Sequence, residues 1–498
     1  MAAGVAAAEV AAAAAVTDGS TATTVAATRP PHGDLPELAS GWPGALGLGL
    51  LWRPRLAPLV ADEATGDTIG FVEVIAESVG RPLPPKLDTL RRQGMTVVPH
   101  GVSLGLGGAH RPEPARLTRL ASTVEACGAP LVSEHIAFVR AGGVEAGHLL
   151  SLPRTHDALD VLVENVREAV AALPARLALE PIATLVDWPG AEMTEVEFLS
   201  ELLERVDVDL VLDVANMHVN AANRRRAGVG GPDADPCSLI EGLPLHRVAY
   251  VHAAGGRVID DRHHDTHTDP LWPEVETLVE ELWSRHEIGG LLLERDGHFP
   301  ADDELRDELA RLDAAATRGR ARRHAGTTPA REANRPSAPD ATHISSARQR
   351  LHVDQQTFVQ AVTAAAPAPP GFDADDLQAV TAVLTHKRAS TVTHAAPDVA
   401  ALPRFADRFR PWAAIHPSNG CAACDAARFV RSLPPTDRTR RASAIALRAE
   451  LDHTVRTRRG RPRPARLRLR AIRSPGTITL GIRLGKHRLV RHLPLRRP

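Results

Sequence analysis

Eight short apolar runs, separated by longer amphipathic segments, constrain the fold of this 498-residue chain more than any other feature. The runs are continuous rather than alternating, which is typical of strands that are buried on both faces of a parallel sheet. Such strands need covering helices on either side. The runs lie at residues 45–50, 69–75, 96–99, 130–133, 177–179, 209–212, 248–251 and 290–293.

The segments between the runs place Leu, Val and Ala three and four residues apart with charges between them, as amphipathic helices do. Eight β-α units in about 270 residues is the stoichiometry of a closed barrel. The expected fold class is therefore α/β, with a (β/α)8 TIM-type barrel over residues 44–313. The clearest helical patterns lie at 117–127, 156–173, 195–205, 273–285 and 302–312.

Composition separates the barrel from the rest of the chain. Residues 1–40 are rich in Ala and Thr and predict a disordered leader, and the Arg/Ala/Thr/Pro-rich residues 314–350 predict a linker. Residues 351–498 predict a basic C-terminal region that is poorly ordered or small and α-rich. Residues 1–313 carry 25 Lys/Arg and 48 Asp/Glu, whereas residues 314–498 carry 34 and 12. An acidic globular chain is thus joined to a basic one.

Several sequence features bear on the compartment. The N-terminal alanine run contains Glu9 and has no basic segment before it, unlike a secretory signal. No apolar stretch reaches the roughly 20 residues that cross a bilayer. Four cysteines in so long a chain suggest a reducing compartment. We therefore expect a cytoplasmic protein without a membrane segment.

Polar residues follow seven of the eight apolar runs. Chemistry in a barrel of this kind lies where the strands end and the βα loops begin, so these side chains are expected to share one mouth. Their nitrogen and oxygen donors suit iron, manganese or zinc. They exceed the four or so ligands that one ion needs, which favours two or more metals. Some of the carboxylates could instead hold imidazole tautomers. The strand-end residues are Glu73, Glu77, His100, Glu134, His135, Glu180, Asp213, Asn216, His218, His252 and Glu294, and a following loop adds Asp265 and His267.

A series of motifs along the barrel region resembles one known family. In its order and content the series is similar to the DUF692 (UPF0276) family of multinuclear non-haem iron-dependent oxidases, over about residues 44–313. The motifs are GALGLGL (45–51), FVEVIAES (71–78), PHGVSLGLGG (99–108), VSEHIAF (132–138), LALEPIA (177–183), EVEFL (195–199), LVLDVANMHVNAAN (210–223), VAYVHAAGG (248–256), DTHTDP (265–270) and LLLERDGHFP (291–300).

The resemblance implies a barrel that holds two or three irons and uses O2 to oxidise a peptide, typically a ribosomally made precursor that contains cysteine. It also implies a partner protein or domain that recognises the leader of that peptide. Glu180 and Asp213 are the expected catalytic residues. Pro181 stands where the family usually has Asn, a change that bears on the substrate pocket. The residues that match the family's metal positions are His100, His135, Glu180, Asn216, His252, Asp265, His267 and Glu294, and Glu134 matches a further motif position.

Two other functions fit parts of the sequence. A His/Glu/Asp ring of this kind also resembles divalent-metal hydrolases and isomerases of the xylose isomerase and endonuclease IV type, which bound zinc or manganese would favour. The Arg-dense residues 456–473 could instead bind nucleic acid with a steep salt dependence, although they lack the aromatic residues that stack on bases. A basic tail that is merely solvated, or that guides an acidic leader peptide, is also compatible with this composition.

The C-terminal region contains one further motif. Cys421 and Cys424 have the spacing that zinc sites and redox pairs use. No second CxxC completes a four-thiolate site, and His416 is the nearest other candidate ligand. Two ordinary reduced cysteines are the alternative.

Overall fold

A computed structural model describes residues 46–65, 68–323, 341–418, 420–453, 468–484 and 487–495 of the chain. These residues form two compact units. The first unit takes in the described residues of 46–139 and 149–355, and the second takes in 140–148 and those from 356 onward. The predicted leader, residues 1–40, lies outside the described residues.

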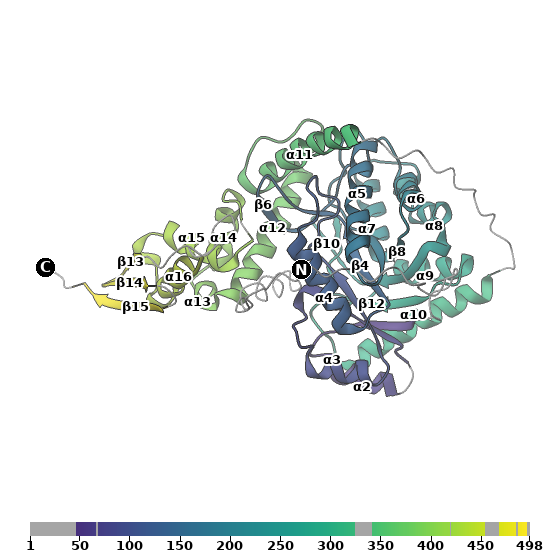
Figure 1. The fold of residues 1–498 in the computed structure, drawn as a ribbon, viewed down its shortest axis with the longest axis horizontal. Coiled ribbons are helices and arrows are strands. Elements are labelled where there is room, and N and C mark those ends of the chain that lie inside the picture. The colour runs from purple at the N-terminus through teal and green to yellow at the C-terminus, as the bar shows by residue number, and fades with distance from the viewer. Residues whose placement is uncertain are drawn as a thin grey trace. The chain divides into compact units, whose positions relative to one another are not determined.

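The first unit is a closed barrel of eight parallel strands with helices between them (Figure 1). The predicted TIM-type fold class is therefore confirmed, and each predicted apolar run overlaps one barrel strand. The strands join in the order β1-β12-β9-β8-β7-β4-β3-β2. Their bounds are β1 Gly47–Leu51, β2 Phe71–Ile75, β3 Thr96–Gly101, β4 Leu131–Ile136, β7 Arg176–Pro181, β8 Asp209–Asp213, β9 Val248–Ala253 and β12 Gly290–Leu293.

Local signals in the sequence set the helix ends around the barrel. Thr194 and Glu197 form a capping box at the start of α6, and Thr155 caps α5 by accepting from the Ala158 amide. Gly128 ends α4 in the left-handed conformation, with φ of 61°. The helices are α2 Ala57–Thr65, α3 Pro85–Arg92, α4 Pro114–Cys127, α5 His156–Ala172, α6 Glu195–Arg205, α7 Val214–Arg226, α8 Pro236–Gly242, α9 Pro273–Arg285 and α10 Asp302–Arg322.

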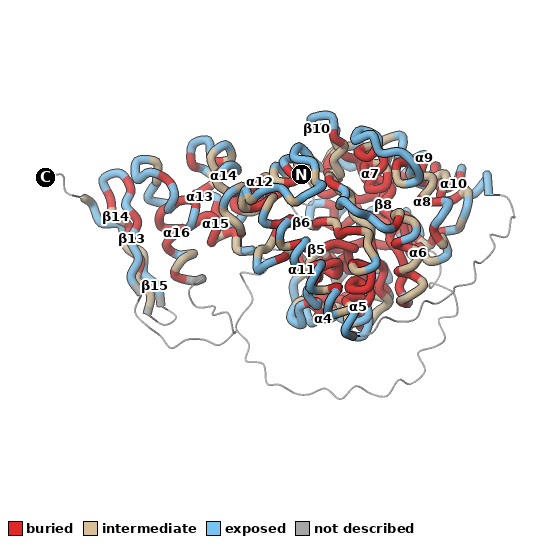
Figure 2. The backbone as a smooth tube through the Cα atoms, turned by 90° about the horizontal axis from the view of Figure 1, so that it is seen from above, coloured by how far each residue is buried: buried red, intermediate tan, exposed pale blue. Residues whose placement is uncertain are grey.

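The two-residue period of the strands decides what fills the barrel. Phe71, Val98 and Val211 belong to an apolar cluster inside the barrel. Since side chains two apart on a strand share a face, the next inward positions are Glu73, His100 and Asp213. Buried residues concentrate within this unit, as the red segments of Figure 2 show. An apolar layer thus lies below a polar one at the carboxyl ends of the strands.

Two hairpins and the ends of the predicted linker differ from the sequence expectation. The hairpins are β5 Phe138–Ala141 with β6 Val144–Leu150, and β10 Arg257–Ile259 with β11 Arg262–His264. Their strands carry polar residues and lack the continuous apolar pattern. Of the expected linker 314–350, residues 314–322 continue α10 because Ala315, Ala316 and Gly319 are buried. Residues 341–350 begin α11 Ala341–Ala364, and 324–340 lie outside the described residues.

The second unit is mainly helical and carries a small sheet. Its apolar core brings together helices α12, α14, α15 and α16, with Phe409 and Phe429 in edge-to-face contact at 5.2 Å. Residues 477–484 form the central strand of an antiparallel three-stranded sheet. The elements are α12 Ala374–Ala395, α13 Pro397–Ala400, α14 Phe405–Ala414, α15 Ala422–Ser432, α16 Arg440–His453, β13 Arg468–Ser474, β14 Thr477–Leu484 and β15 His487–Pro494.

Among the described residues, every helix is too short or too polar to cross a membrane.

Candidate metal centre

Four overlapping groups of side chains, all buried except the half-buried Asp265, lie at and beyond the carboxyl ends of the barrel strands. Within each group, one ligand atom from every residue lies within 4.8 Å of the others. Glu180 belongs to the first and second groups, Asp213 to the second and third, and His267 to the third and fourth, so the groups form one continuous series. The groups are His100, His135 and Glu180; Glu180, Asp213 and His252; Asp213, Asp265 and His267; and His267, Glu294 and Asp296.

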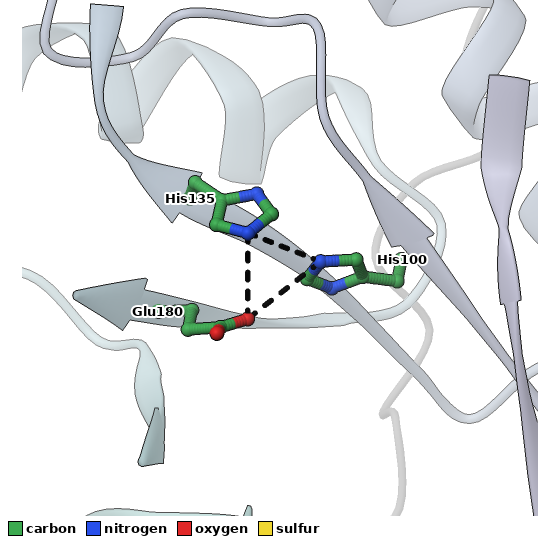
Figure 3. A group of neighbouring side chains, drawn as sticks. All are labelled: His100, His135 and Glu180. Carbon is green, nitrogen blue, oxygen red and sulfur yellow. Dashed lines mark hydrogen bonds and ion pairs between the residues drawn. The ribbon is translucent and has the colours of Figure 1, made fainter. Parts of the chain in front are cut away.

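The first group comes from three neighbouring strands, β3, β4 and β7 (Figure 3). Nε2 of His100 lies 3.3 Å from Nε2 of His135, and each of these nitrogens lies 3.6 Å from Oε2 of Glu180. Ligands 2.1 Å from an ion at tetrahedral angles lie about 3.4 Å apart. The three atoms therefore have the spacing of ligands that share one ion.

The other groups have similar spacings. Nδ1 of His252 lies 3.5 Å from Glu180 Oε2 and 3.1 Å from Glu294 Oε2. Nε2 of His267 lies 2.5 Å from Asp265 Oδ1 and 3.5 Å from Asp213 Oδ2. Nδ1 of the same ring lies 3.0 Å from Glu294 Oε1. Imidazoles and carboxylates thus alternate across the mouth.

Unpartnered polar atoms concentrate in this series and beside it. Seven buried side-chain atoms here, on five carboxyl or amide groups and two imidazoles, have no hydrogen-bond partner with proper geometry. Leaving a buried polar atom unpaired costs about 1–3 kcal/mol, and more for a charged group. A cation bound by these atoms would remove that cost, so the residues fit a metal. The atoms are Glu73 Oε1, Glu180 Oε2, Asp213 Oδ2, Asn216 Oδ1, His252 Nδ1, Asp265 Oδ1 and His267 Nε2.

The pKa directions show how strongly the groups depend on one another. Burial lowers the pKa of His100 well below its ordinary value, and His135 and His252 lower it further. Burial also acts to lower the pKa of His252, but Glu73 and Glu180 outweigh it and raise that pKa well above the ordinary value. Imidazolium charge therefore balances the carboxylates, and a bound cation would take over that role.

Glu294 and His267 shift each other's pKa, the carboxyl group downward and the imidazole upward. Burial acts to raise the pKa of Glu294, but His267 and His252 bring it well below its ordinary value. Burial acts to lower the pKa of His267, but Asp265 and Glu294 raise it well above the ordinary value.

Asp213 and Asn216 are positioned by the start of α7. One carboxylate oxygen of Asp213 accepts from the amides of Ala215 and Asn216 at 2.7 and 3.0 Å, which caps the helix. The other oxygen is left for the polar series. The side-chain amide of Asn216 donates to Glu180 Oε1 at 3.4 Å and to the Pro181 carbonyl at 3.3 Å, so its own oxygen is also available.

A buried chain of hydrogen bonds begins at Nδ1 of His100, the ring nitrogen that does not belong to the first group. Nδ1 of His100 lies 2.8 Å from the Ser133 hydroxyl, which lies 2.8 Å from the Tyr250 hydroxyl. Tyr250 donates to Glu73 Oε2 at 2.5 Å, and Nε2 of His252 lies 3.0 Å from the same oxygen. Partners of this kind fix the tautomer and orientation of a metal-binding imidazole.

Glu134 and Asn216 lie outside the four groups, whereas the other residues predicted as ligands belong to them. Glu134 precedes His135 on β4 and therefore points to the opposite face of the strand. Its carboxylate accepts from the His135 amide at 2.9 Å and from the Leu104 amide at 3.1 Å. The structure places it as a support for the loop after β3. Its assignment as a metal ligand stays a prediction.

Two acidic residues outside the family's metal positions belong to the polar layer. Glu73 is fully buried beside His252, and its position two residues after the inward Phe71 is the signal that identifies it. Asp296 is part of the fourth group and pairs with the buried Arg53. Asp296 follows a strand by three residues in a loop, so no strand periodicity indicates its direction.

Comparison with known protein families gives two matches. A family model described as "RiPP precursor modification enzyme MbnB/TglH/ChrH" matches residues 46–317, which is more than half of the chain. A second model, described as "SCO6045-like, C-terminal domain", matches residues 352–435.

Curated relatives carry the name UPF0276 protein. One from Streptomyces avermitilis is 42% identical over 440 residues, covering 78% of this chain and 88% of the relative. One from Rhizorhabdus wittichii is 37% identical over 264 residues, covering 51% of this chain and 89% of the relative. Among solved structures, endonuclease IV from Thermus thermophilus aligns with a TM-score of 0.36 and 17% identity, covering 54% of this chain and 99% of that one.

Proposed function

Because the chain belongs to the MbnB/TglH/ChrH family of RiPP precursor modification enzymes, the DUF692 or UPF0276 family, we propose that its barrel is a multinuclear iron-dependent oxidase. Its co-substrate is O2, and its substrate is a ribosomally made peptide that it modifies at a cysteine. The observation that carries the proposal is the continuous series of four donor groups, in which five buried atoms are unpartnered, together with two more on Glu73 and Asn216 beside it.

The donor chemistry supports a multinuclear site. Carboxylate and imidazole donors suit iron, manganese and zinc, and the four groups contain no cysteine. Glu180 and Asp213 each belong to two groups, so each carboxylate can serve two ions. Iron bound there would supply redox chemistry with O2, and it would offer the substrate thiolate a ligand site.

The residues of the chain have separate tasks in this proposal. Glu180 and Asp213 would each help to hold two ions, and we propose them as the catalytic carboxylates. Ser133 and Tyr250 orient His100, and the Glu134 carboxylate orders the loop between β3 and α4. The apolar layer below the site, which includes Phe71 and Val98, keeps water away from the metal ligands on that side.

Metal analysis of the full chain, purified without oxygen, tests the proposal. We expect at least two irons per chain and the Mössbauer or EPR signature of coupled ions. In His100→Ala the iron content should fall sharply. The matched control is His218→Ala, because His218 lies outside the four groups, against His263 and Trp272.

Other outcomes separate the rival functions. Bound zinc or manganese, together with activity that does not consume O2, would support a hydrolase or isomerase. Iron that is present only as isolated single ions would contradict the multinuclear site. With iron in place, O2 consumption that a cysteine-containing peptide stimulates and its Cys→Ser form does not would support the substrate class.

A further inference from the structure

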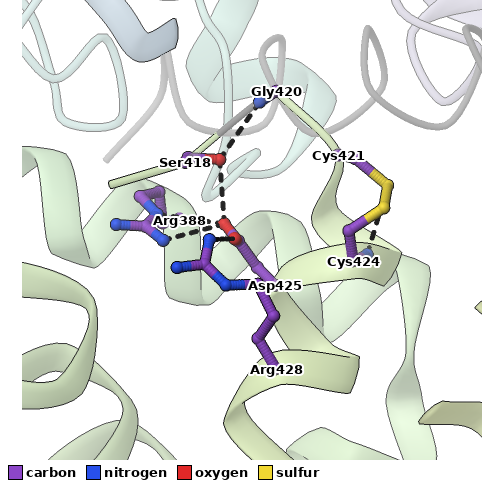
Figure 4. The surroundings of a disulfide bond; sticks show 7 residues. All are labelled: Arg388, Ser418, Gly420, Cys421, Cys424, Asp425 and Arg428. Atoms are coloured by element: carbon purple, nitrogen blue, oxygen red, sulfur yellow. Dashed lines mark hydrogen bonds and ion pairs between the residues drawn. A yellow bond between two sulfur atoms is a disulfide. The ribbon is translucent and has the colours of Figure 1, made fainter. Parts of the chain in front are cut away.

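Cys421 and Cys424 form a disulfide in the second unit, where they take no part in the metal centre (Figure 4). Their Cα atoms lie 5.1 Å apart at the start of α15. The chain has two other cysteines, Cys127 and Cys237, and both are free thiols. Cys421 and Cys424 are therefore oxidised, whereas the other two cysteines are reduced.

The two sulfurs differ in access and environment. Cys421 is half-buried and caps α15, and its sulfur accepts from the Cys424 amide at 3.2 Å. Cys424 is only 7% exposed. A sulfur at a helix N-terminus that accepts a backbone amide is one whose thiolate is stabilised. Cys421 is thus the more exposed residue of the pair and has the better nucleophile after reduction.

The segment around the pair is anchored by other contacts. Asp425 is 2% exposed, and one of its oxygens accepts from Arg388 Nη2 at 2.9 Å and from the Ser418 hydroxyl at 2.9 Å. Arg388 also donates to the Ala413 carbonyl at 2.7 Å. One helical turn further along α15, Phe429 packs in the core of the unit.

These contacts join α12, the end of α14 and the start of α15 without the disulfide. The loop that the disulfide closes spans only three residue positions, so it restricts the unfolded chain much less than a long loop would. Reduction is therefore compatible with an intact fold.

A zinc site is disfavoured among the residues that the structure describes. His416, the third ligand that the sequence suggested, is stacked on Trp412 with ring centroids 4.6 Å apart. Its Nδ1 lies 2.6 Å from the Trp412 carbonyl oxygen. The groups of side chains with metal-binding geometry contain neither cysteine.

We propose that Cys421 and Cys424 are a thiol–disulfide exchange site whose substrate is a low-molecular-weight thiol. A thiolate attacks Sγ of Cys421, the bond between the two cysteine sulfurs breaks, and Cys424 leaves as a thiolate that takes a proton from water. A second thiolate then attacks the outer sulfur of the mixed disulfide and releases Cys421. Two electrons pass to the protein, and the two external thiols become one disulfide. The reverse sequence reoxidises the pair.

Redox titration of the full chain tests this site. The protein is equilibrated in buffers of defined reduced-to-oxidised dithiothreitol ratio, quenched in acid, labelled with a maleimide and analysed by mass spectrometry. We expect two thiols, beyond those of Cys127 and Cys237, to appear together in one two-electron transition without denaturant. The circular dichroism should not change. Cys237→Ser is the control and should keep the same midpoint.

Single variants identify the attacked sulfur. With oxidised glutathione, Cys424→Ser should form a mixed disulfide at Cys421 at least tenfold faster than Cys421→Ser forms one at Cys424. Three results would overturn the proposal: reduction of the wild type only in denaturant, thiols that stay labelled under oxidising conditions, or equal rates for the two variants.

Discussion

Neighbouring carboxylates on β4 and β7 differ in the direction they face, and this difference separates a loop support from a proposed metal ligand. Glu134 and Glu180 are both almost fully buried, at 1% and 2% exposure. Glu180 faces the barrel interior and its Oε2 lies within 3.6 Å of three imidazole nitrogens. Glu134 faces outward and accepts two backbone amides. The two side chains are the same residue type and almost equally buried. The direction in which each side chain points from its strand therefore separates the two roles.

This contrast gives a paired prediction. Glu180→Gln replaces a charged oxygen shared by two donor groups, so we expect at least half of the bound iron to be lost, together with oxidase turnover. Glu134→Gln should keep its iron and lose about 1–2 kcal/mol of stability, because one backbone amide loses its charged acceptor. Iron analysis and chemical denaturation measure both effects. Equal iron loss in the two variants would refute the separation of roles.

A buried thiol in α4 allows a prediction about pH. Burial raises the pKa of the Cys127 thiol to about 11 from an ordinary value of 9.0. A raised folded-state pKa means that the folded state holds the proton more tightly than the unfolded state. The stability from this protonated thiol is therefore fully present below pH 9 and is lost as the pH rises from 9 to 11.

The full effect of these two pKa units is about 2.7 kcal/mol. Denaturant unfolding of the wild type and of Cys127→Ala at several pH values isolates it, because other ionising groups cancel in the difference. We expect Cys127→Ala to be less stable at pH 8, where it loses only packing, and the gap to close by pH 11. Parallel stability curves would show that the thiol does not titrate in this range.

Among the elements, the barrel strands could be predicted and the hairpins could not. A strand buried on both faces must be continuously apolar, so a run such as 209–212 indicates β8 without further information. β6 alternates small, polar and apolar residues, and β10 has three residues, so neither carries a pattern of its own. The clustering of the strand-end side chains followed from the barrel topology. Asp296 in a loop required the tertiary structure.

The last barrel helix gives a prediction at this scale. Gly319 lies where α10 meets α9, and a Cβ there would stand 2.4 Å from the Glu280 carbonyl oxygen and 2.7 Å from Trp283 Cβ. Alanine in a helix would normally gain up to about 1 kcal/mol over glycine. Because a backbone oxygen cannot move aside cheaply, we expect Gly319→Ala to destabilise the barrel by about 1–3 kcal/mol.

Chemical denaturation with Gly230→Ala as the control checks this prediction. A Cβ at Gly230 would meet nothing within 4 Å, so that variant should stay within about 0.5 kcal/mol of the wild type. A stabilised Gly319→Ala would mean that α10 ends its packing before residue 319 and that the expected boundary at residue 313 is the better one.

The whole molecule combines two units. Each unit has its own apolar core and its own group of chemically active side chains. The core of the first unit surrounds the barrel, and the core of the second includes Phe409, Phe429 and Leu447. The proposed iron site belongs only to the first unit and the cysteine pair only to the second. A ligand stabilises the unit that binds it, by RT ln(1 + [L]/Kd).

Metal removal should therefore act on one unit alone. Without iron, the carboxylates of the four groups keep their unpartnered atoms. Iron at 100 times its Kd would stabilise the barrel by roughly 3 kcal/mol, and this stabilisation should be lost on chelation.

Hydrogen exchange measured by mass spectrometry resolves the two units. Peptides from β3, β4 and β7 should exchange faster after chelation and recover when ferrous iron is added without oxygen. Peptides from α14 to α16 should not change, whereas reducing the cysteine pair should affect only those around α15. Loss of protection in both units after chelation would mean that the metal stabilises the whole chain. Unchanged protection in the barrel would mean that a bound metal does not contribute to barrel stability.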